Sequence, residues 1–134
     1  MILTIDIGGG STEFVIGHQG KILYSISLQL GHITITRRFS EVEKMREHIR
    51  SVIFATDLVS RVKRYNIKNV IGSSGTIRKI EKLVYKGYAR DLQEDVQELH
   101  GFQRNKSFNK EDLKRLVEIL INEEMENGVN ERRI

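Results

Sequence analysis

Apolar and polar residues follow a strand-like pattern over the first thirty positions of the chain. Residues 2–7 (ILTIDI) are rich in β-branched side chains, residues 12–16 (TEFVI) repeat that composition, and residues 21–30 (KILYSISLQL) alternate apolar with polar positions. The connections at 8–11 (GGGS) and 18–20 (HQG) are long enough only for tight turns. The pattern predicts an antiparallel three-stranded start whose third strand has one face in water.

Beyond these strands, the apolar residues recur at helical spacing. A short helix is predicted after Leu30–Gly31–His32, and one long amphipathic helix is predicted over residues 41–65, behind a capping-box pair of Ser40 and Glu43. The inner face of the long helix would be formed by Val42, Met45, Ile49, Val52, Val59 and Val62.

A fourth strand is predicted at 69–72 (NVIG), followed by a helix that runs to about Tyr85. The polar stretch 87–107 is expected to be a loop or an insertion. The last helix should start at Asn109, with Asp112 at its third position, and end at Gly128. Its apolar face would bury Leu113, Leu116, Val117, Leu120 and Met125.

The resulting order, β-β-β-α-β-α-α, belongs to the α/β class, and we expect residues 1–134 to form a single domain. With no cysteine, disulfides and thiolate chemistry are excluded. No apolar run approaches the ~20 residues that span a bilayer, and no secretory signal is evident, so we expect a cytoplasmic protein without a membrane partner. The net charge of +4 is spread along the chain and aromatic residues make up only 7%, which argues against a nucleic-acid partner.

The turn after the first strand is the strongest candidate for chemistry. Three successive glycines let main-chain amides converge on an anion, and the two hydroxyl side chains that follow add donors, so phosphate is a natural ligand. The candidate phosphate-binding residues here are Gly8, Gly9, Gly10, Ser11 and Thr12. The turn is no dinucleotide fingerprint, because its glycines lead into a strand, and it is no P-loop, because no GK[ST] follows.

Two carboxylates flank this turn. Asp6 lies near the end of the first strand and Glu13 lies on the returning strand, close enough for both to share a hydrated Mg²⁺. Proteins hold Mg²⁺ with one or two carboxylates plus waters and phosphate oxygens. The alternative is an ordinary glycine hairpin with two solvated acids.

A second glycine turn joins the fourth strand to the next helix. Its amides and the helix dipole also suit an anion, and the candidates are Gly72, Ser73, Ser74, Gly75 and Thr76. The alternative is that Ser74 or Thr76 merely caps the helix. Weaker candidates are His32, Arg37 and Arg38, for which a structural or surface role is the alternative, and no Ser–His–Asp arrangement is supported.

Three segments together carry a family resemblance: DIGGGSTEF at 6–14, SLQLGHITITRRF at 27–39 and VIGSSGTIRKI at 70–80. They resemble the exopolyphosphatase/guanosine pentaphosphate phosphatase (Ppx/GppA) family, a branch of the actin, sugar-kinase and heat-shock-protein superfamily with RNase-H-like domains. The chain departs from the family pattern at Gln29, Arg37 and Ser74, which stand where the family has proline, an acid and glycine.

The resemblance implies that Asp6 and Glu13 serve Mg²⁺ and the attacking water, and that the two glycine turns and Gly31 hold phosphates. It also implies that the chain corresponds to the second of two domains and lacks the first domain and the last strand and helix. Half an active site would then be present, completed by the missing domain or another chain, and a homodimer is possible.

The function expected from the resemblance is a phosphoanhydride hydrolase that releases terminal phosphate from polyphosphate or guanosine pentaphosphate. A second hypothesis is a non-catalytic sensor that binds polyphosphate or a nucleotide without hydrolysis. An ATP-dependent kinase of the same superfamily is a third, less favoured because GGGSTE differs from a kinase phosphate loop.

Overall fold

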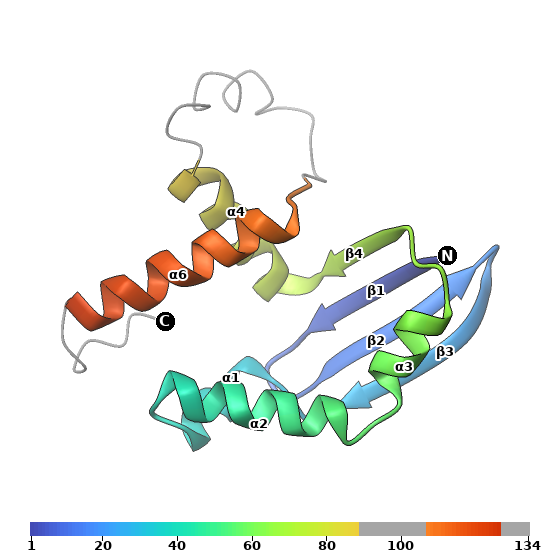
Figure 1. Cartoon of the computed structure of the whole chain (residues 1–134), viewed down its shortest axis with the longest axis horizontal. Coiled ribbons are helices and arrows are strands. Elements are labelled where there is room, and N and C mark those ends of the chain that lie inside the picture. Colours follow the sequence, from blue (N-terminus) through green and yellow to red (C-terminus); the bar gives the residue numbers. More distant parts are fainter. Residues whose placement is uncertain (89–106, 127–134) are drawn as a thin grey trace. The chain divides into compact units, whose positions relative to one another are not determined.

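The structure is a computed structural model that describes residues 1–88 and 107–126. The chain divides into two units, residues 1–78 and 79–134 (Figure 1). The first unit holds both glycine turns and is the one that positions the candidate site. Among the described helices, none has the length and apolar character needed to cross a membrane.

The first unit is built on a four-stranded sheet. Its strands are β1 (Ile2–Ile7), β2 (Thr12–His18), β3 (Lys21–Leu28) and β4 (Asn69–Ser73), in the spatial order β3-β2-β1-β4 (Figure 1). β1, β2 and β3 pair in antiparallel fashion, whereas β4 lies parallel to β1. The predicted antiparallel start and the crossover into a fourth strand are therefore confirmed.

The two predicted turns are also present. Residues 8–11 join β1 to β2, and the β2–β3 turn has positive φ angles at Gln19 (48°) and Gly20 (77°). Positive φ favours glycine, which explains Gly20 in the β2–β3 turn. β3 ends at Leu28, two residues before the predicted end of the strand.

Three helices of the first unit are α1 (His32–Arg38), α2 (Val42–Phe54) and α3 (Leu58–Arg64). Together with one face of the sheet they form the core, in which Leu28, Leu30 and Leu58 are buried. Partly buried residues packed against these three come from β2, β3 and the helices: Phe14, Tyr24, Ile26, Ile35, Ile49, Val52, Ile53 and Val62.

The prediction of one continuous helix over 41–65 was wrong, because the chain bends between α2 and α3. Thr56 donates its hydroxyl to the carbonyl of Ile53 (2.7 Å) and accepts the amide of Leu58 (3.3 Å). Such local side-chain bonds compete with the helical ladder. The side chain of Asp57, at the N-cap of α3, is instead bonded to Tyr24 of β3.

The predicted capping box at Ser40 and Glu43 was also wrong. The N-cap of α2 is Glu41, and no side-chain hydrogen bond caps this helix. Within α2 no residue is fully buried, and the predicted inner face is half-buried.

In the second unit, α6 (Lys110–Glu126) begins as predicted. The amide of Asp112 donates to Oδ1 of Asn109 (2.8 Å), and the amide of Asn109 donates to Oδ2 of Asp112 (3.0 Å), which is a reciprocal cap. Leu116 is buried, but Val117 and Leu120 are 38% and 42% exposed, so their predicted burial was wrong. The side chain of Met125, residues 89–106 of the predicted polar stretch and the helix end at Gly128 lie outside the described residues.

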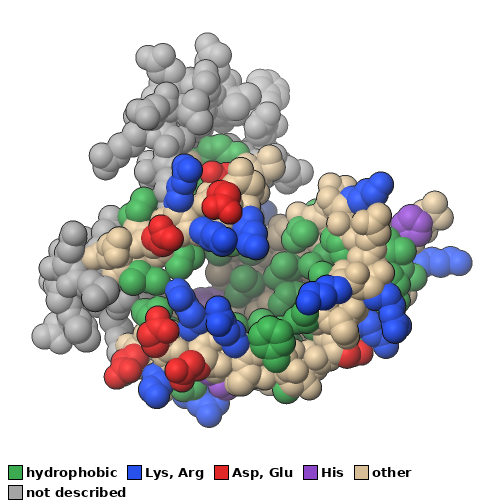
Figure 2. Space-filling view, in the orientation of Figure 1, with side chains coloured by type: hydrophobic (Ala, Val, Ile, Leu, Met, Phe, Trp, Pro, Cys, Tyr) green, Lys and Arg blue, Asp and Glu red, His purple; other side chains and the backbone are tan. Residues whose placement is uncertain are grey.

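The helix after β4, α4 (Ser74–Tyr88), starts in the first unit and extends three residues beyond the predicted end. Opposite the helix-covered side, the sheet of the first unit has a second face that includes Asp6 and Glu13. Ile2, Ile22 and Ile71 on this second face are among the exposed large apolar residues. Figure 2 views the first unit from the side of α3, and apolar side chains are visible there beside this helix.

Candidate functional site

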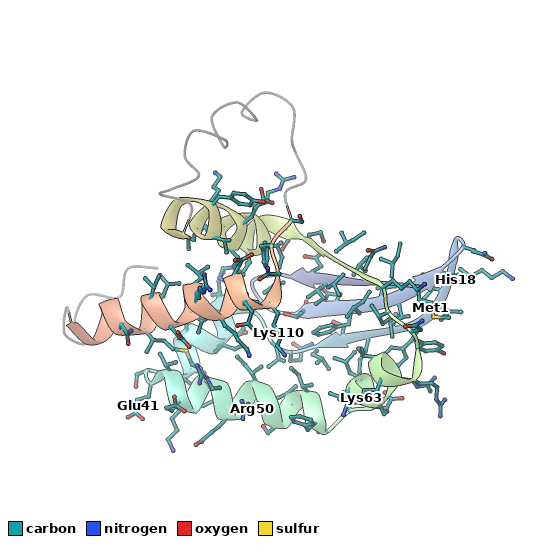
Figure 3. All side chains as sticks on the ribbon, turned by 45° about the horizontal axis from the view of Figure 1, so that its top comes forward. Met1, His18, Glu41, Arg50, Lys63 and Lys110 are labelled. Atoms are coloured by element: carbon teal, nitrogen blue, oxygen red, sulfur yellow. The ribbon has the colours of Figure 1, made fainter. Side chains whose placement is uncertain are left out.

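Both glycine turns lie at the same end of the sheet. Residues 8–11 follow β1 and residues 74–76 follow β4, and the parallel register places Asp6 beside Ser73. The hydroxyl of Ser74 donates to the carbonyl of Ile7 (2.8 Å), which ties the second turn to the end of β1. Met1 and His18 mark the opposite end of the sheet (Figure 3). The structure thus brings together the two sites that the sequence predicted separately.

A polar row crosses the sheet at this end. Ser27 of β3 is the register partner of Glu13, Glu13 is the partner of Asp6, and Asp6 is the partner of Ser73. Partners in register project their side chains on the same face. One serine, two acids and a second serine therefore lie side by side over the four strands, on the face that α2 and α3 do not cover.

The backbone of the first turn is held by α1. The amide of His32 donates to the carbonyl of Gly8 (3.1 Å), and those of Ile33 and Thr34 donate to the carbonyl of Gly9 (3.0 and 3.3 Å). In a trans peptide the N–H points away from the C=O, and the described residues contain no cis peptide. The N–H groups of Gly9 and Gly10, which share peptides with these carbonyls, therefore point away from α1.

The amides of Gly9 and Gly10 are two donors that the turn offers. The amide of Gly8 is used within the turn, since it donates to the carbonyl of Ser11 (2.9 Å). Within the described residues, the amides of Gly9 and Gly10 donate to no backbone carbonyl. Adjacent amides aimed in one direction suit an anion such as a phosphate oxygen.

Gly31 lies directly against the backbone of this turn. A Cβ atom at Gly31 would lie 2.0 Å from the carbonyl oxygen of Gly9, so no other residue fits without moving the backbone. Because the first amides of α1 already donate to Gly8 and Gly9, this helix start is not free for an anion. A direct contact between Gly31 and phosphate stays a prediction.

The two hydroxyls after the glycines serve the protein itself. Buried Thr12 donates its hydroxyl to the carbonyl of Leu30, and Ser11 donates to Oε1 of Glu13 (2.6 Å). Since a hydroxyl has one hydrogen, the Thr12 side chain in this arrangement has no second one to donate, and a phosphate contact of Thr12 stays a prediction. Ser11 in this arrangement orients Glu13.

Glu13 accepts a second hydrogen bond on the same oxygen, from the hydroxyl of Ser27 (3.0 Å). The bond from Ser11, followed by that from Ser27, lowers the pKa of Glu13 below its ordinary value of 4.5, against a smaller opposing effect of desolvation. Glu13 is therefore a carboxylate at neutral pH. Within the described residues, no hydrogen bond ends on its Oε2.

The donor set fits a hydrated magnesium ion. Asp6 and Glu13 are direct cross-strand partners, for which Cβ atoms lie about 4.5–5.5 Å apart, and like charges so placed repel each other. A divalent cation would remove that repulsion. The described residues contain no group of three or more His, Asp or Glu that could enclose a metal, so waters and phosphate oxygens would fill the remaining positions.

The second turn has one unusual residue. Ser74 adopts a φ of 85°, a backbone conformation that residues other than glycine rarely take. Gly72 allows β4 to approach α4, since a Cβ there would lie 2.6 Å from Cγ2 of Ile77. Gly75 faces open space, and together with Ser73 and Thr76 it stays a predicted phosphate contact.

Sequence reasoning missed Ser27, although the alternation of residues 21–30 placed it on the wet face. Only the register of β3 against β2 shows that it meets Glu13. Of the weaker candidates, His32 contributes its amide to the first turn, whereas Arg37 and Arg38 lie in the last turn of α1, away from that contact. Arg38 stacks over the ring of Phe39 at 5.1 Å.

A shallow apolar groove of about 320 Å³ lies elsewhere on the first unit. It includes none of the predicted site residues and is lined by Ile2, Thr4, Val15, Gly17, His18, Gln19, Gly20, Lys21, Ile22 and Ile71.

Comparisons with known proteins extend this picture. A putative exopolyphosphatase of Haemophilus influenzae is 32% identical over 88 residues, which cover 61% of this chain and 27% of that protein. A bifunctional 3-dehydroquinate synthase/phosphatase of Fusobacterium nucleatum is 53% identical over 38 residues, covering 28% of this chain and 6% of that protein. The chain thus spans well under two thirds of the length of these relatives.

Among solved structures, an exopolyphosphatase from Cytophaga hutchinsonii superposes with a TM-score of 0.68 at 23% identity, covering 91% of this chain and 39% of that one. This likeness shows the fold, an α/β fold with a mixed sheet that the chain shares with that exopolyphosphatase. The sequence profile of the Ppx/GppA phosphatase family matches residues 1–134. The chain belongs to the Ppx/GppA phosphatase family.

Proposed function

We propose that this chain supplies one side of a phosphoanhydride hydrolase site, which releases the terminal phosphate from polyphosphate or guanosine pentaphosphate with Mg²⁺. The observation that supports it most is the register of β1 and β2, which sets Asp6 directly opposite Glu13 at the base of the glycine turn. Two like charges at neighbouring positions are unfavourable for folding alone. A bound cation would offset the repulsion between Asp6 and Glu13.

The residues divide the work between them. The amides of Gly9 and Gly10 bind oxygens of the terminal phosphate, and the amides around Gly75 at the start of α4 bind a neighbouring phosphate. Asp6 and Glu13 would hold the cation on the open face of the sheet, and their carboxylates are placed to accept a hydrogen bond from the attacking water. When bound, Mg²⁺ would supply charge neutralisation on the phosphate oxygens.

A complete site requires more than this chain provides. Hydrolysis in line with the leaving phosphate needs groups on both sides of the transferred phosphoryl group. The described residues offer one side, and the longer relatives have room for the other. We propose that a further domain or another chain supplies it. Binding of phosphate by this chain alone does not depend on that partner.

The test is binding of tripolyphosphate to the 134-residue chain, measured by isothermal titration calorimetry with and without Mg²⁺. We expect Mg²⁺ to strengthen the binding of tripolyphosphate. In Asp6→Asn or Glu13→Gln, the affinity measured with Mg²⁺ should be at least about tenfold lower than in the wild type. Glu47→Gln on α2, an exposed acid-to-amide change of the same kind, is the matched control and should bind like the wild type. Equal binding by all four proteins would contradict the proposal.

Hydrolysis is tested after the chain is combined with the domain or chain that completes it. Release of inorganic phosphate from tripolyphosphate, lost in Glu13→Gln, supports the hydrolase. Tight binding with no product after long incubation favours the sensor instead. Competition between tripolyphosphate and guanosine pentaphosphate then identifies the preferred substrate.

A further inference from the structure

Glu13 is held by two serines from different parts of the chain. The hydroxyl of Ser11 comes from the glycine turn and reaches Oε1 at 2.6 Å, and the hydroxyl of Ser27 comes from β3 and reaches the same atom at 3.0 Å. Both hydroxyls donate to one oxygen, and within the described residues neither donates elsewhere. The carboxylate is therefore fixed through one oxygen only.

This one-sided arrangement distinguishes Glu13 from Asp6. A glutamate at a partly exposed strand position has three rotatable bonds, and ordering it costs more conformational entropy than ordering an aspartate. Asp6 is also flanked by a serine, Ser73, yet within the described residues no hydrogen bond from Ser73 reaches it. The longer acid receives the hydrogen-bond support.

We propose that Ser27 is a positioning residue, which together with Ser11 holds Oε1 of Glu13 and leaves Oε2 for the cation that Glu13 shares with Asp6. This inference rests on the proposed function. Groups that orient a metal ligand raise the metal affinity without touching the metal, and their loss typically lowers affinity by about tenfold or more. Ser27 is suited to this task because it belongs to a regular strand rather than to the turn that would contact phosphate.

The test uses Mn²⁺ as a probe for the magnesium position, with its affinity for the 134-residue chain followed by electron paramagnetic resonance. Ser27→Ala is expected to weaken Mn²⁺ binding about tenfold. Ser27→Thr keeps the hydroxyl and should bind within about twofold of the wild type, because threonine is well accepted in strands. Ser25→Ala, on the same strand and face but paired with Val15, is the matched control and should bind as the wild type does.

A second measurement needs no metal. Side-chain scalar couplings of Glu13 in the nuclear magnetic resonance spectrum should report one rotamer in the wild type and in Ser27→Thr, and an average of rotamers in Ser27→Ala. A purely stabilising serine would change the melting temperature but neither the rotamer nor the affinity pattern.

The outcomes separate the two ideas. If the wild type binds Mn²⁺ and Ser27→Ala binds it equally well, the positioning role is overturned and the proposed function stands. If the wild type binds no Mn²⁺, the cation site and the proposed function are both overturned, whatever the couplings show. If Glu13 keeps one rotamer in Ser27→Ala, Ser27 does not position it.

Discussion

The two glycine turns at the end of the sheet reach their conformations in different ways. The first, residues 8–11, has no residue with positive φ and is held from below by three amides of α1. The second, residues 72–76, has Ser74 at a φ of 85° and is tied by one side-chain bond to the carbonyl of Ile7. Backbone hydrogen bonds to α1 therefore fix the first turn, whereas one side-chain hydrogen bond and a residue with positive φ fix the second.

This difference indicates which turn depends on the other. The first turn is supported by α1, whereas the anchor of the second is the end of β1, which leads directly into the first. A change that displaces residues 8–11 should therefore disturb residues 72–76 as well. A change in the second turn should leave the first intact.

The largest effect is expected at Gly31. In Gly31→Ala the new Cβ would lie 2.0 Å from the carbonyl oxygen of Gly9, a backbone atom that cannot swing aside. We expect a loss of about 3 kcal/mol or more in the free energy of unfolding, measured by chemical denaturation. Binding at both turns should fail together if the fold survives.

Gly10→Ala is the matched control for this clash. A Cβ at Gly10 meets nothing within 4 Å, and its φ is not positive, so its stability should change by less than about 1 kcal/mol. Similar losses in the two variants would show that the approach of α1 to the turn is not as described.

The second largest effect is expected at Thr12, where the buried hydroxyl bonds the carbonyl of Leu30. Thr12→Val keeps the shape but leaves that carbonyl buried without a donor, which should cost about 1–3 kcal/mol in denaturation experiments. Affinity of the folded protein for tripolyphosphate should not change. A selective loss of affinity with unchanged stability would instead support Thr12 as a phosphate ligand.

Much of this arrangement could be predicted from the sequence because it is local. Strand alternation in residues 21–30, the glycines at 8–10 and the HQG turn at 18–20 predicted the sheet start, and the Asn109–Asp112 spacing predicted the start of α6. These features involve residues close in sequence, for which periodicity and capping rules apply.

What could not be predicted depends on contacts distant in sequence. The hydroxyl of Thr12 meets Leu30, eighteen residues away, and Ser27 meets Glu13 only through the strand register. The break between α2 and α3 has a local cause in Thr56. The sequence did not reveal this break, because the helical spacing of apolar residues continues from α2 into α3. At positions with distant contacts, the residue type indicates that a side chain is polar but does not identify the residue it bonds.

A smaller effect is expected at Ser74. Ser74→Ala loses the bond to Ile7 and keeps the positive φ, so it should destabilise by about 1 kcal/mol. Ser74→Gly loses the same bond but relieves the strain, and it should be more stable than Ser74→Ala by about 1 kcal/mol. Equal stabilities of the two variants would show that Ser74 is not strained.

The smallest effect is pH-dependent and belongs to the first turn alone, because residues 72–76 contain no acid. The hydrogen bonds from Ser11 and Ser27 lower the pKa of folded Glu13 below 4.5, the value expected in the unfolded chain. The unfolded state then binds the proton more readily, so this contribution to stability is complete above about pH 4.5 and is lost as the pH falls through the folded pKa. Melting temperatures measured between pH 3 and 6 should fall less steeply in Glu13→Gln than in the wild type. Ser27→Ala should give an intermediate slope and Ser25→Ala the wild-type slope, and a common slope for all four proteins would mean that neither serine stabilises the ionised carboxylate.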